Sequence, residues 1–300
     1  MRLVSVNAFD LYDGDDPAAE ERFARLEALV RGLDADVLAV QEIVAREPGP
    51  RDPDKRDLAT TRLRRLAKAV DRQWKHRGEP MLALGGGIHH AALLWREGIT
   101  PVPGTLDRYE RADAGLWHSL ITCVFDLGGP RLRIGSVQLS PFDQAWGWSD
   151  AAQILRAMHG DSVPGFVGGD FNGLGTTTVV QPDGSEAFYD HDPYRNQPWH
   201  PEFAYQFDEH GNLDRRVAFR LERLGGMRDC ARIAGAPWTA TTGFHPADNH
   251  PPRRLDRWYA THHAPDFAVR GLTVVDHGVV GDCTAHAPVV LEVDHTVIGR

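Results

Sequence analysis

GGDFN, residues 168–172, closes an apolar, glycine-rich run that begins at Val163 and has the pattern of a buried strand. On extended backbone, side chains two residues apart point to the same face, so Asp170 and Asn172 can converge while Phe171 turns into the core. A carboxylate beside an amide at the end of a strand suits a water-activating base next to a group that holds an oxyanion. The same spacing also suits an Asx turn where a strand stops, and the sequence leaves both interpretations open.

The composition is that of a globular protein with a large core. The 300 residues are 42% hydrophobic and 25% charged, without a linker or internal repeat, so we expect a single domain over residues 1–300. The net charge of −9 gives no basic footprint for duplex DNA. Cys123, Cys230 and Cys283 lack the spacing of a zinc site or a disulfide framework. The chain opens in a strand-like segment and no apolar run reaches membrane-spanning length, so we expect a cytoplasmic monomer without a membrane partner.

Alternation and apolar spacing predict many strands separated by few helices. The expected strands cover residues 3–6, 36–42, 89–95, 119–127, 132–139, 163–169, 254–261, 272–277 and 288–293. The expected helices cover residues 17–32, 61–74, 149–159 and 215–224, with a charged loop at 46–56 and a long polar, aromatic insert at 176–212. Because strands arrive in consecutive pairs, the pattern favours two sheets packed face to face with helices outside them, rather than a regular βαβ repeat.

Polar residues recur where the predicted strands end, namely Asn7, Glu42, Gln138, Asp170, Asn172, Asp256 and His286. Asp256 lies in an apolar, aromatic strand, where a buried carboxylate needs a partner. A salt bridge to Arg253, Arg254 or Arg257 and a metal role explain this residue equally well. His286 precedes an apolar strand, and a hydrogen-bonded core histidine competes there with a functional one.

The ordered set of motifs resembles the endonuclease/exonuclease/phosphatase superfamily, whose members include exonuclease III-like nucleases, deoxyribonuclease I, neutral sphingomyelinases and inositol polyphosphate 5-phosphatases. Residues 4–7 (VSVN) are similar to its opening strand-to-Asn motif, and residues 36–42 (DVLAVQE) closely match its DVLALQE motif. Residues 169–172 are its G-D-F-N signature. Residues 254–258 (RLDRW) are similar to its RIDYI strand, and residues 284–289 (TAHAPV) take the place of its terminal SDHRPV. The resemblance covers essentially the whole chain. It implies a four-layered α/β sandwich of two mainly antiparallel sheets with outer helices and the site at one end.

The resemblance implies a divalent metal site. Glu42 would be the principal ligand of Mg²⁺ or Mn²⁺, and Asn7 and Asp256 would support the cation directly or through waters. Oxygen ligands of this kind suit a hard cation and not a thiolate-bound metal. The cation would polarise a phosphoryl oxygen and stabilise the leaving oxygen.

The resemblance also implies roles in the hydrolysis of a phosphate ester. Asp170 would orient or deprotonate the attacking water, Asn172 would hydrogen-bond the phosphoryl oxygens, and His286 would act on the phosphate as a cation or donor. Gln138 can donate a hydrogen bond to a phosphoryl oxygen. Trp148, with the aromatic residues of the insert, could stack a base or hydrophobic ring of the substrate. The alternative is that these aromatic residues pack into a cluster of their own.

Two positions depart from the superfamily's pattern. Gln138 stands where members usually have a histidine or a tyrosine, and Ala285 replaces the aspartate that normally precedes the terminal histidine. We expect the loss of that carboxylate to lower the basicity of His286 and to weaken cation binding. Asp282, earlier in the same segment, is a candidate to substitute for it.

These residues predict a divalent-metal-dependent phosphoesterase that acts on a small phosphate ester or a short nucleic acid. Its acidic core is intact, and clustered acids repel one another unless a cation lies between them. A diverged member with a non-standard reaction on a small metabolite, or a catalytically silent binding protein, is the alternative. The chain has 15 histidines without clear ligand spacing, so we interpret the pairs His89-His90 and His262-His263 as surface residues or residues outside the metal's ligand shell.

Overall fold

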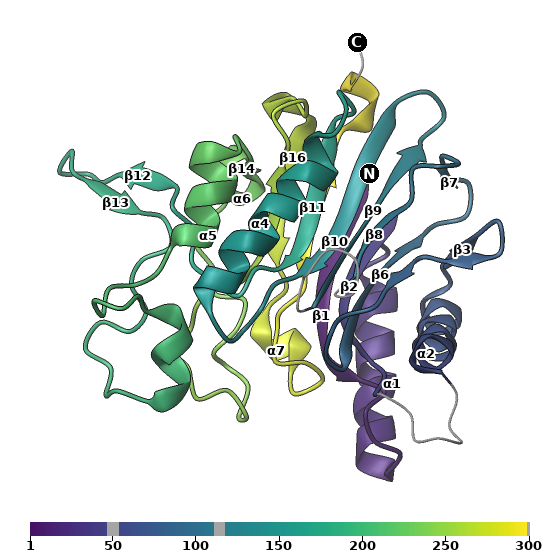
Figure 1. The fold of residues 1–300 in the computed structure, drawn as a ribbon, viewed down its shortest axis with the longest axis horizontal. Helices are drawn as coiled ribbons and strands as arrows, with labels where there is room; N and C mark the ends of the chain where they lie inside the picture. Colours follow the sequence, from purple (N-terminus) through teal and green to yellow (C-terminus); the bar gives the residue numbers. More distant parts are fainter. Residues whose placement is uncertain (47–53, 111–117, 299–300) are drawn as a thin grey trace.

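The computed structural model describes residues 1–46, 54–110 and 118–298, which form two β-sheets packed face to face (Figure 1). The first sheet has six strands, in the order β16 (Val269–Val274), β17 (Val289–Val293), β1 (Arg2–Leu11), β2 (Val37–Val44), β6 (His89–Trp95) and β5 (Leu82–Ala83). The second sheet has seven strands, in the order β14 (Arg228–Asp229), β15 (Asp256–Ala260), β11 (Gly165–Asp170), β10 (Arg131–Gln138), β9 (Ser119–Asp126) and β7 (Thr100–Pro101), with β8 (Asp107–Tyr109) also beside β9.

Most strand pairs within these sheets are antiparallel. The parallel pairs among the described residues are β1 with β2 in the first sheet and β10 with β11 in the second. Parallel neighbours finish at the same edge of a sheet. The carboxyl ends of these four strands therefore lie at one end of the sandwich, and this is where the predicted site residues are found.

Helices cover the outer face of each sheet and complete four layers (Figure 1). The first sheet is covered by α1 (Pro17–Gly32) and α2 (Lys55–Val70), and the second by α4 (Gln144–His159), α5 (Arg216–Ala218) and the π-helical turn η2 (Phe219–Leu224). The smaller elements are β3 (Lys75–His76), β4 (Glu79–Pro80), β12 (Thr178–Val180), β13 (Glu186–Phe188), η1 (Pro201–Gln206), α6 (Cys230–Ile233), η3 (Asp266–Ala268), α7 (His277–Val280) and η4 (His295–Val297). The predicted fold class is confirmed. Within the described ranges no helix has both the length and the apolar character needed to span a lipid bilayer.

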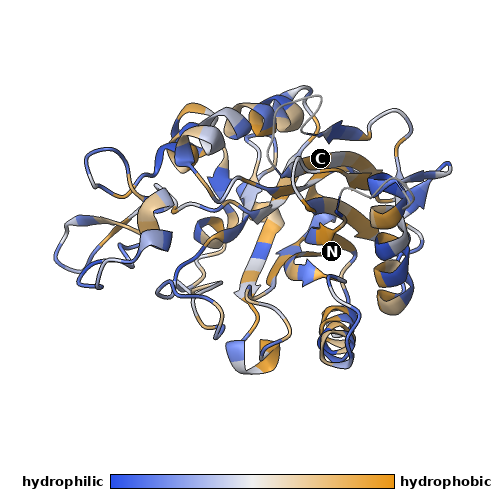
Figure 2. Cartoon of the chain, turned by 60° about the horizontal axis from the view of Figure 1, so that its bottom comes forward, coloured by the Kyte–Doolittle hydropathy of each residue, from blue (hydrophilic) through white to orange (hydrophobic). Residues whose placement is uncertain are grey.

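The core between the sheets is apolar on both sides. Its fully buried side chains include Leu3, Val37, Leu93, Ile134, Phe166 and Trp258. The strands of the two sheets carry much of the hydrophobic colour in Figure 2, whereas the surrounding loops are largely hydrophilic. Burial of this apolar area is the main force that brings the two sheets together.

Several element boundaries differ from the sequence prediction for local reasons. Helix α4 begins at Gln144 and not at residue 149, because the Asp143 carboxylate accepts a hydrogen bond from the Ala145 amide and caps the helix. Trp146 and Trp148, which precede the predicted helix start, are therefore helical. Helix α2 begins at Lys55 behind an Asp54 cap, earlier than predicted, and residues 47–53 of the predicted charged loop lie outside the described residues.

Strand β1 does not stop at Asn7 as predicted. It continues to Leu11 through a register shift opposite β2, with Phe9 and Asp10 at positive φ (47° and 55°). Such irregularities bend a strand and redirect its side chains. The Asp10 side chain is thereby placed beside Glu42 and His89, as described below.

Gly168 and Gly169 allow β11 to approach its two neighbouring strands, β10 and β15, closely. A Cβ atom on Gly169 would lie 1.8 Å from the Val137 carbonyl oxygen of β10, and one on Gly168 would lie 2.7 Å from the Trp258 ring of β15. No side chain fits at either distance. The two glycines therefore let β11 pack against its neighbours, and this explains the glycine-rich run before Asp170.

We expect Gly169→Ala to lower the free energy of unfolding by at least about 2 kcal/mol, because the added methyl group overlaps backbone and not a movable side chain. The matched control is Gly271→Ala in β16, where no atom lies within 4 Å of the added Cβ. Its effect should stay within about 1 kcal/mol. Urea denaturation measures both, and equal effects would contradict the close approach of β11 to β10.

Candidate active site

The polar residues predicted from the strand ends come together at one end of the sandwich. Asn7 on β1 is paired in register with Gln41, which precedes Glu42 on the parallel strand β2. Gln138 at the end of β10 is the register partner of Asp170 at the end of β11. Asp170 is in turn opposite Asp256 on β15. Strand register, and not proximity in sequence, therefore collects these side chains.

Two amides connect the carboxylates of Glu42 and Asp170. Asn7 Nδ2 donates to Glu42 Oε1 at 2.9 Å and to Asp170 Oδ2 at 3.1 Å. Gln138 Nε2 donates to the same Glu42 oxygen at 2.7 Å and lies 3.5 Å from Asp170 Oδ2. All four side chains are buried. Glu42 also has a φ of 62°, in the left-handed region, and strained backbone of this kind concentrates at functional sites.

Asp170 makes the predicted Asx turn and also belongs to the polar cluster. Its Oδ1 accepts a hydrogen bond from the Asn172 backbone amide at 3.0 Å, while its Oδ2 accepts from Asn172 Nδ2 at 3.2 Å. Asn172 Nδ2 also donates to the Leu139 carbonyl at 2.9 Å. Phe171 points the other way, into the core against Tyr259. The two interpretations of this motif are thus compatible.

Burial raises the pKa of Asp170 to about 6. The positive charge of His286 opposes this shift, whereas the negative charge of Asp256 adds to it. Only 2% of the residue's surface is exposed, so ionisation of this carboxyl group depends on its neighbours rather than on water. A carboxyl group with a pKa near neutrality can serve as a general base at physiological pH.

The partner of Asp256 is His286, so the interpretation of Asp256 as the partner of a neighbouring arginine, one of the two that the sequence left open, does not hold. His286 Nδ1 lies 2.9 Å from Asp256 Oδ2. The three candidate arginines point elsewhere: Arg253 pairs with Asp248, Arg254 with Asp190 and Asp229, and Arg257 with Asp190. Asp256 Oδ1 is buried and has no hydrogen-bond partner.

The expectation that Ala285 lowers the basicity of His286 is also wrong. Burial alone would lower the pKa of His286, but the charge and hydrogen bond of Asp256, reinforced by the Asp170 carboxylate, raise it to about 10. The orienting carboxylate therefore comes from β15 and not from position 285. Asp282 does not replace it, because its carboxylate pairs with Arg25 at the surface.

Asp10 and His89 also belong to the cluster, although the sequence prediction missed both. His89 Nε2 lies 2.6 Å from Asp10 Oδ1 and 4.0 Å from Glu42 Oε2. The Asp10 backbone amide donates to the same Glu42 oxygen at 3.1 Å. The backbone turn at Asp10 gave no sequence signal. The alternation of β6 could have identified His89, because successive side chains on a strand face opposite ways and His90 is turned inward.

Glu42 is ionised despite its burial. Burial opposes the charged form, but nearby positive charge at His89 and His286 outweighs it and lowers the pKa of Glu42 to about 2. The hydrogen bonds from Asn7 and Gln138 act in the same direction. Glu42 therefore presents a permanent negative charge at the end of β2.

The cluster has the donor atoms that a divalent cation needs. Asp10, Glu42 and His89 offer ligand atoms within 4.8 Å of one another, and Asp170, Asp256 and His286 form a second such group. The partnerless oxygen of Asp256 and the concentration of acids fit a cation at this end of the sandwich. Asn7 and Asp256 as direct ligands stay predictions, since Asn7 turns its NH₂ group toward the carboxylates and Asp256 contacts His286.

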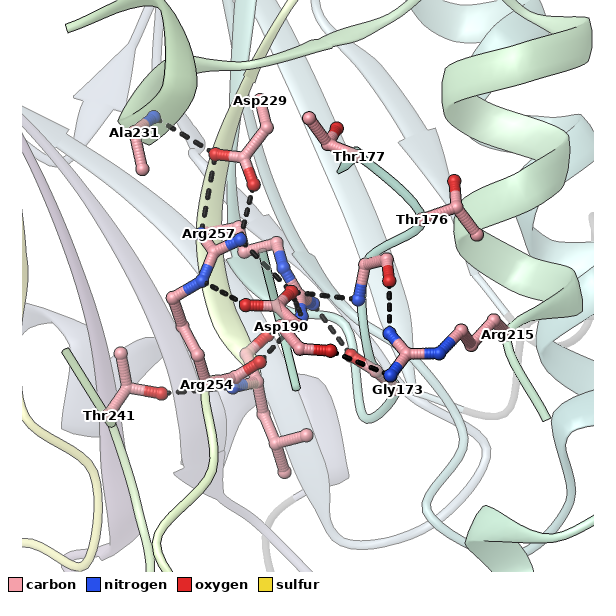
Figure 3. A network of polar contacts seen from close by, with 12 residues as sticks. Gly173, Thr176, Thr177, Asp190, Arg215, Asp229, Ala231, Thr241, Arg254 and Arg257 are labelled. Carbon is pink, nitrogen blue, oxygen red and sulfur yellow. Dashed lines mark hydrogen bonds and ion pairs between the residues drawn. The ribbon is translucent and has the colours of Figure 1, made fainter. Parts of the chain in front are cut away.

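A buried ion network connects the loop after Asn172 with strand β15, two segments of the polar cluster (Figure 3). Asp190, from the insert, lies 2.7 Å from both Arg254 Nε and Arg257 Nη2 and accepts a hydrogen bond from the Gly175 amide at 2.8 Å. Arg257 Nη1 donates to the Gly173 carbonyl at 2.6 Å. The network thus ties the loop after Asn172 to the strand that carries Asp256.

Some aromatic residues of the insert pack against one another, in line with the alternative interpretation, while Phe188 and Trp199 are exposed. Tyr194 contacts the rings of Phe203 and Phe207. Gln206 was not predicted, yet its Nε2 donates at 2.9 Å to the Asn172 carbonyl at the site. Trp148 packs beneath the Arg220 guanidinium, 4.6 Å from its ring centre, so its role in substrate binding stays a prediction.

Comparisons with known proteins identify the family and support the fold. The family model described as "Endonuclease/Exonuclease/phosphatase family" matches residues 6–282, while no curated protein matches the sequence. Similar solved structures include a protein of this family from Leptotrichia buccalis, with 15% identity, 98% and 99% coverage of the two chains and a TM-score of 0.58. A mannosyl-6-phosphatase from Bacteroides thetaiotaomicron has 13% identity, 98% and 99% coverage and a TM-score of 0.61. Truncated TDP2 from Caenorhabditis elegans has 12% identity, 97% and 96% coverage and a TM-score of 0.54.

We expect Asp256→Asn to lower the pKa of His286 from about 10 toward the ordinary histidine range, because Asp256 supplies the main stabilising charge. In the wild type the folded pKa exceeds the unfolded one. The stabilisation of the folded state by the Asp256–His286 pair is therefore complete below about pH 6.5 and is lost as the pH rises toward 10. NMR titration of the imidazole in the presence of a chelator measures the shift. Asp282→Asn is the control and should leave the titration unchanged; a shift in that variant instead would refute the Asp256 pairing.

Proposed function

The chain belongs to the endonuclease/exonuclease/phosphatase family, and on this premise we propose that it hydrolyses a phosphate ester at the cluster of Asp10, Glu42, Asp170 and His286. One observation carries the proposal. The Asp170 carboxylate is buried, and its oxygen lies within 4.8 Å of ligand atoms of Asp256 and His286. These surroundings raise the pKa of Asp170 to about 6 and that of His286 to about 10. A base and a fixed positive charge side by side are what in-line attack of water on a phosphate requires.

Asp170 acts as the general base for the attacking water. Asn7 and Asn172 hold its carboxylate in a single orientation through hydrogen bonds to Oδ2, and the Asn172 backbone amide fixes Oδ1. Both N–H groups of the Asn172 side chain are used, one by Asp170 and one by the Leu139 carbonyl. We therefore assign Asn172 to positioning the base, in place of the phosphate contact that the resemblance implied.

His286 binds the phosphoryl group. Asp256 fixes the ring through Nδ1, which leaves the other ring nitrogen to donate to a phosphoryl oxygen as negative charge develops on it. A buried acid against a histidine ring is also the base-orienting pair of other hydrolases, but here the charge and hydrogen bond of Asp256 raise the pKa of His286 to about 10 and favour the protonated ring.

Gln138 contributes an acceptor to the site. Its NH₂ group is turned toward Glu42 and Asp170, while its buried carbonyl Oε1 has no partner. An amide oxygen repels a phosphoryl oxygen but accepts a hydrogen bond from water or a substrate hydroxyl. Gln138 thus orients the attacking water or the alcohol portion of the ester, a task different from that of the histidine or tyrosine it replaces.

A divalent cation, Mg²⁺ or Mn²⁺, would be held by Glu42 and Asp10, with Asn7 and Asp256 close by. When bound, it would supply Lewis-acid stabilisation of the phosphoryl and leaving oxygens. The pKa of Glu42, lowered to about 2, keeps this ligand charged over the whole physiological range.

The substrate is proposed to be a small phosphate ester or a short nucleic acid. The net charge of −9 opposes binding along a duplex. Similarity to a mannosyl-6-phosphatase makes sugar phosphates the first monoesters to assay, although at 13% identity that similarity concerns the fold. We propose that the active form is a cytoplasmic monomer.

Asp170→Asn should reduce hydrolysis of mono- and bis-aryl phosphates in the presence of Mg²⁺ or Mn²⁺ by about a hundredfold or more, the usual cost of removing a catalytic acid–base group. Asp282→Asn, on the surface, should keep wild-type rates. Circular dichroism verifies the fold of both variants. Equal activity in the wild type and Asp170→Asn would dismiss the hydrolase proposal in favour of another reaction or a silent binding protein.

The pH dependence of kcat/KM should be bell-shaped. The rate rises as Asp170 loses its proton near its pKa of about 6 and falls as His286 loses its proton near its pKa of about 10. In Asp256→Asn the alkaline limb should move to lower pH while the acidic limb moves much less. An alkaline limb that does not respond to this substitution would contradict the role of His286.

A further inference from the structure

His89 differs from the other histidines of β6 and its surroundings because one ring nitrogen faces two carboxylates. Its Nε2 lies 2.6 Å from Asp10 Oδ1 and 4.0 Å from Glu42 Oε2. His90, the next residue, has both ring nitrogens occupied, one by the Gly85 amide and one by the Ala45 carbonyl. His90 is therefore a hydrogen-bonded residue of the core, whereas the His89 side chain points into the acidic cluster.

Two buried polar atoms beside this cluster lack partners. His118 is 4% exposed, its ring meets that of His89 edge-on at 5.4 Å, and its Nδ1 has no hydrogen-bond partner. Gln138 is 3% exposed, is bonded through Nε2 to Glu42, and has a partnerless Oε1. The two side chains also interact with each other. Gln138 Oε1 can in addition accept a hydrogen bond from a water ligand of a bound cation, so the polar groups beside the cluster are compatible with a hydrated ion there.

We propose that His89 is a nitrogen ligand of the cation held by Asp10 and Glu42, and that the site therefore selects a divalent transition metal over Mg²⁺. The proposal rests on the proposed phosphoesterase site and names the class of its cation. The three side chains offer ligand atoms within 4.8 Å of one another, and they come from β1, β2 and β6, which are adjacent in the first sheet.

The choice of metal follows from ligand chemistry. Mg²⁺ binds oxygen ligands and retains several waters, so an imidazole adds little to its affinity. Zn²⁺, Fe²⁺ and Co²⁺ accept imidazole nitrogen readily, and their affinity for mixed nitrogen and oxygen sites exceeds that of Mn²⁺ in the usual order. The oxygen-only ligand set expected from the sequence becomes a mixed set once His89 is included.

The second group of possible ligands, Asp170, Asp256 and His286, is less available to a cation than the first. Its histidine, His286, already has Nδ1 against Asp256, and Asp170 is engaged by three amide donors. His89 has the carboxylates of Asp10 and Glu42 on one side and the buried ring of His118 on another. The assignment to His89 can therefore be tested against His286 directly.

Pulsed EPR of bound Mn²⁺ tests the assignment without relying on activity. The wild type, labelled with ¹⁵N-histidine, is compared with His89→Gln and with His286→Gln as the matched control. We expect a histidine nitrogen coupling that is lost in His89→Gln and retained in His286→Gln. Absence of a histidine coupling in the labelled wild type, or its loss only in His286→Gln, would overturn the proposal.

Calorimetric titration with Co²⁺ and with Mg²⁺ measures the selectivity. We expect the wild type to prefer Co²⁺, and His89→Gln to lose Co²⁺ affinity by about tenfold or more while its Mg²⁺ affinity changes much less. Equal losses for both metals would overturn the proposed selectivity. If the full chain binds Co²⁺ through His89 but hydrolyses no phosphate ester, the proposed function fails and the metal assignment stands.

Discussion

Three carboxylates, Glu42, Asp170 and Asp256, are buried at one end of the sandwich, and the cost of burying their charges constrains everything around them. A buried carboxylate is tolerated only when hydrogen bonds or opposite charge compensate for lost water. The His286 imidazolium supplies the opposite charge, and the amides of Asn7 and Gln138 supply the hydrogen bonds. The same contacts lower the pKa of Glu42 to about 2, whereas burial raises that of Asp170 to about 6. One set of contacts thus gives two neighbouring carboxyl groups different protonation behaviour, as the proposed roles of metal ligand and general base require.

Strand register and the buried ion network around Asp190 together position these groups. Parallel pairing of β1 with β2 and of β10 with β11 brings four strand ends to one edge, and the glycines of β11 let the second sheet close there. Asp190 then joins the loop after Asn172 to β15 through Arg254 and Arg257. Removing one member would leave a buried charge unpaired, which typically costs about 3–5 kcal/mol. The insert that carries Asp190 therefore helps to hold the polar cluster together.

The sequence sufficed for the fold and for most of the residues in the cluster, because hydrophobic alternation and short motifs report strands and strand ends. It did not reveal contacts that depend on side-chain direction. Asp256 has arginines as sequence neighbours, but its partner is the histidine His286. The alanine at position 285 was expected to lower the basicity of His286 because the sequence did not show that Asp256 pairs with this histidine. Asp10 was missed because an irregularity of the β1 backbone redirects its side chain. His89 was missed because the two carboxylates beside it, those of Asp10 and Glu42, come from other strands. Helix starts were misplaced where an aspartate cap extends the helix by a turn or more.

A crystal structure of the protein with orthovanadate and a divalent cation tests the central claim most directly, because vanadate adopts the five-coordinate geometry of phosphoryl transfer. We expect vanadate to bind within the cluster, with one axial oxygen facing Asp170 and an equatorial oxygen hydrogen-bonded to His286. Vanadate bound elsewhere, or a cluster that stays closed to it at saturating concentration, would contradict the claim that this end of the sandwich is where a phosphate ester reacts.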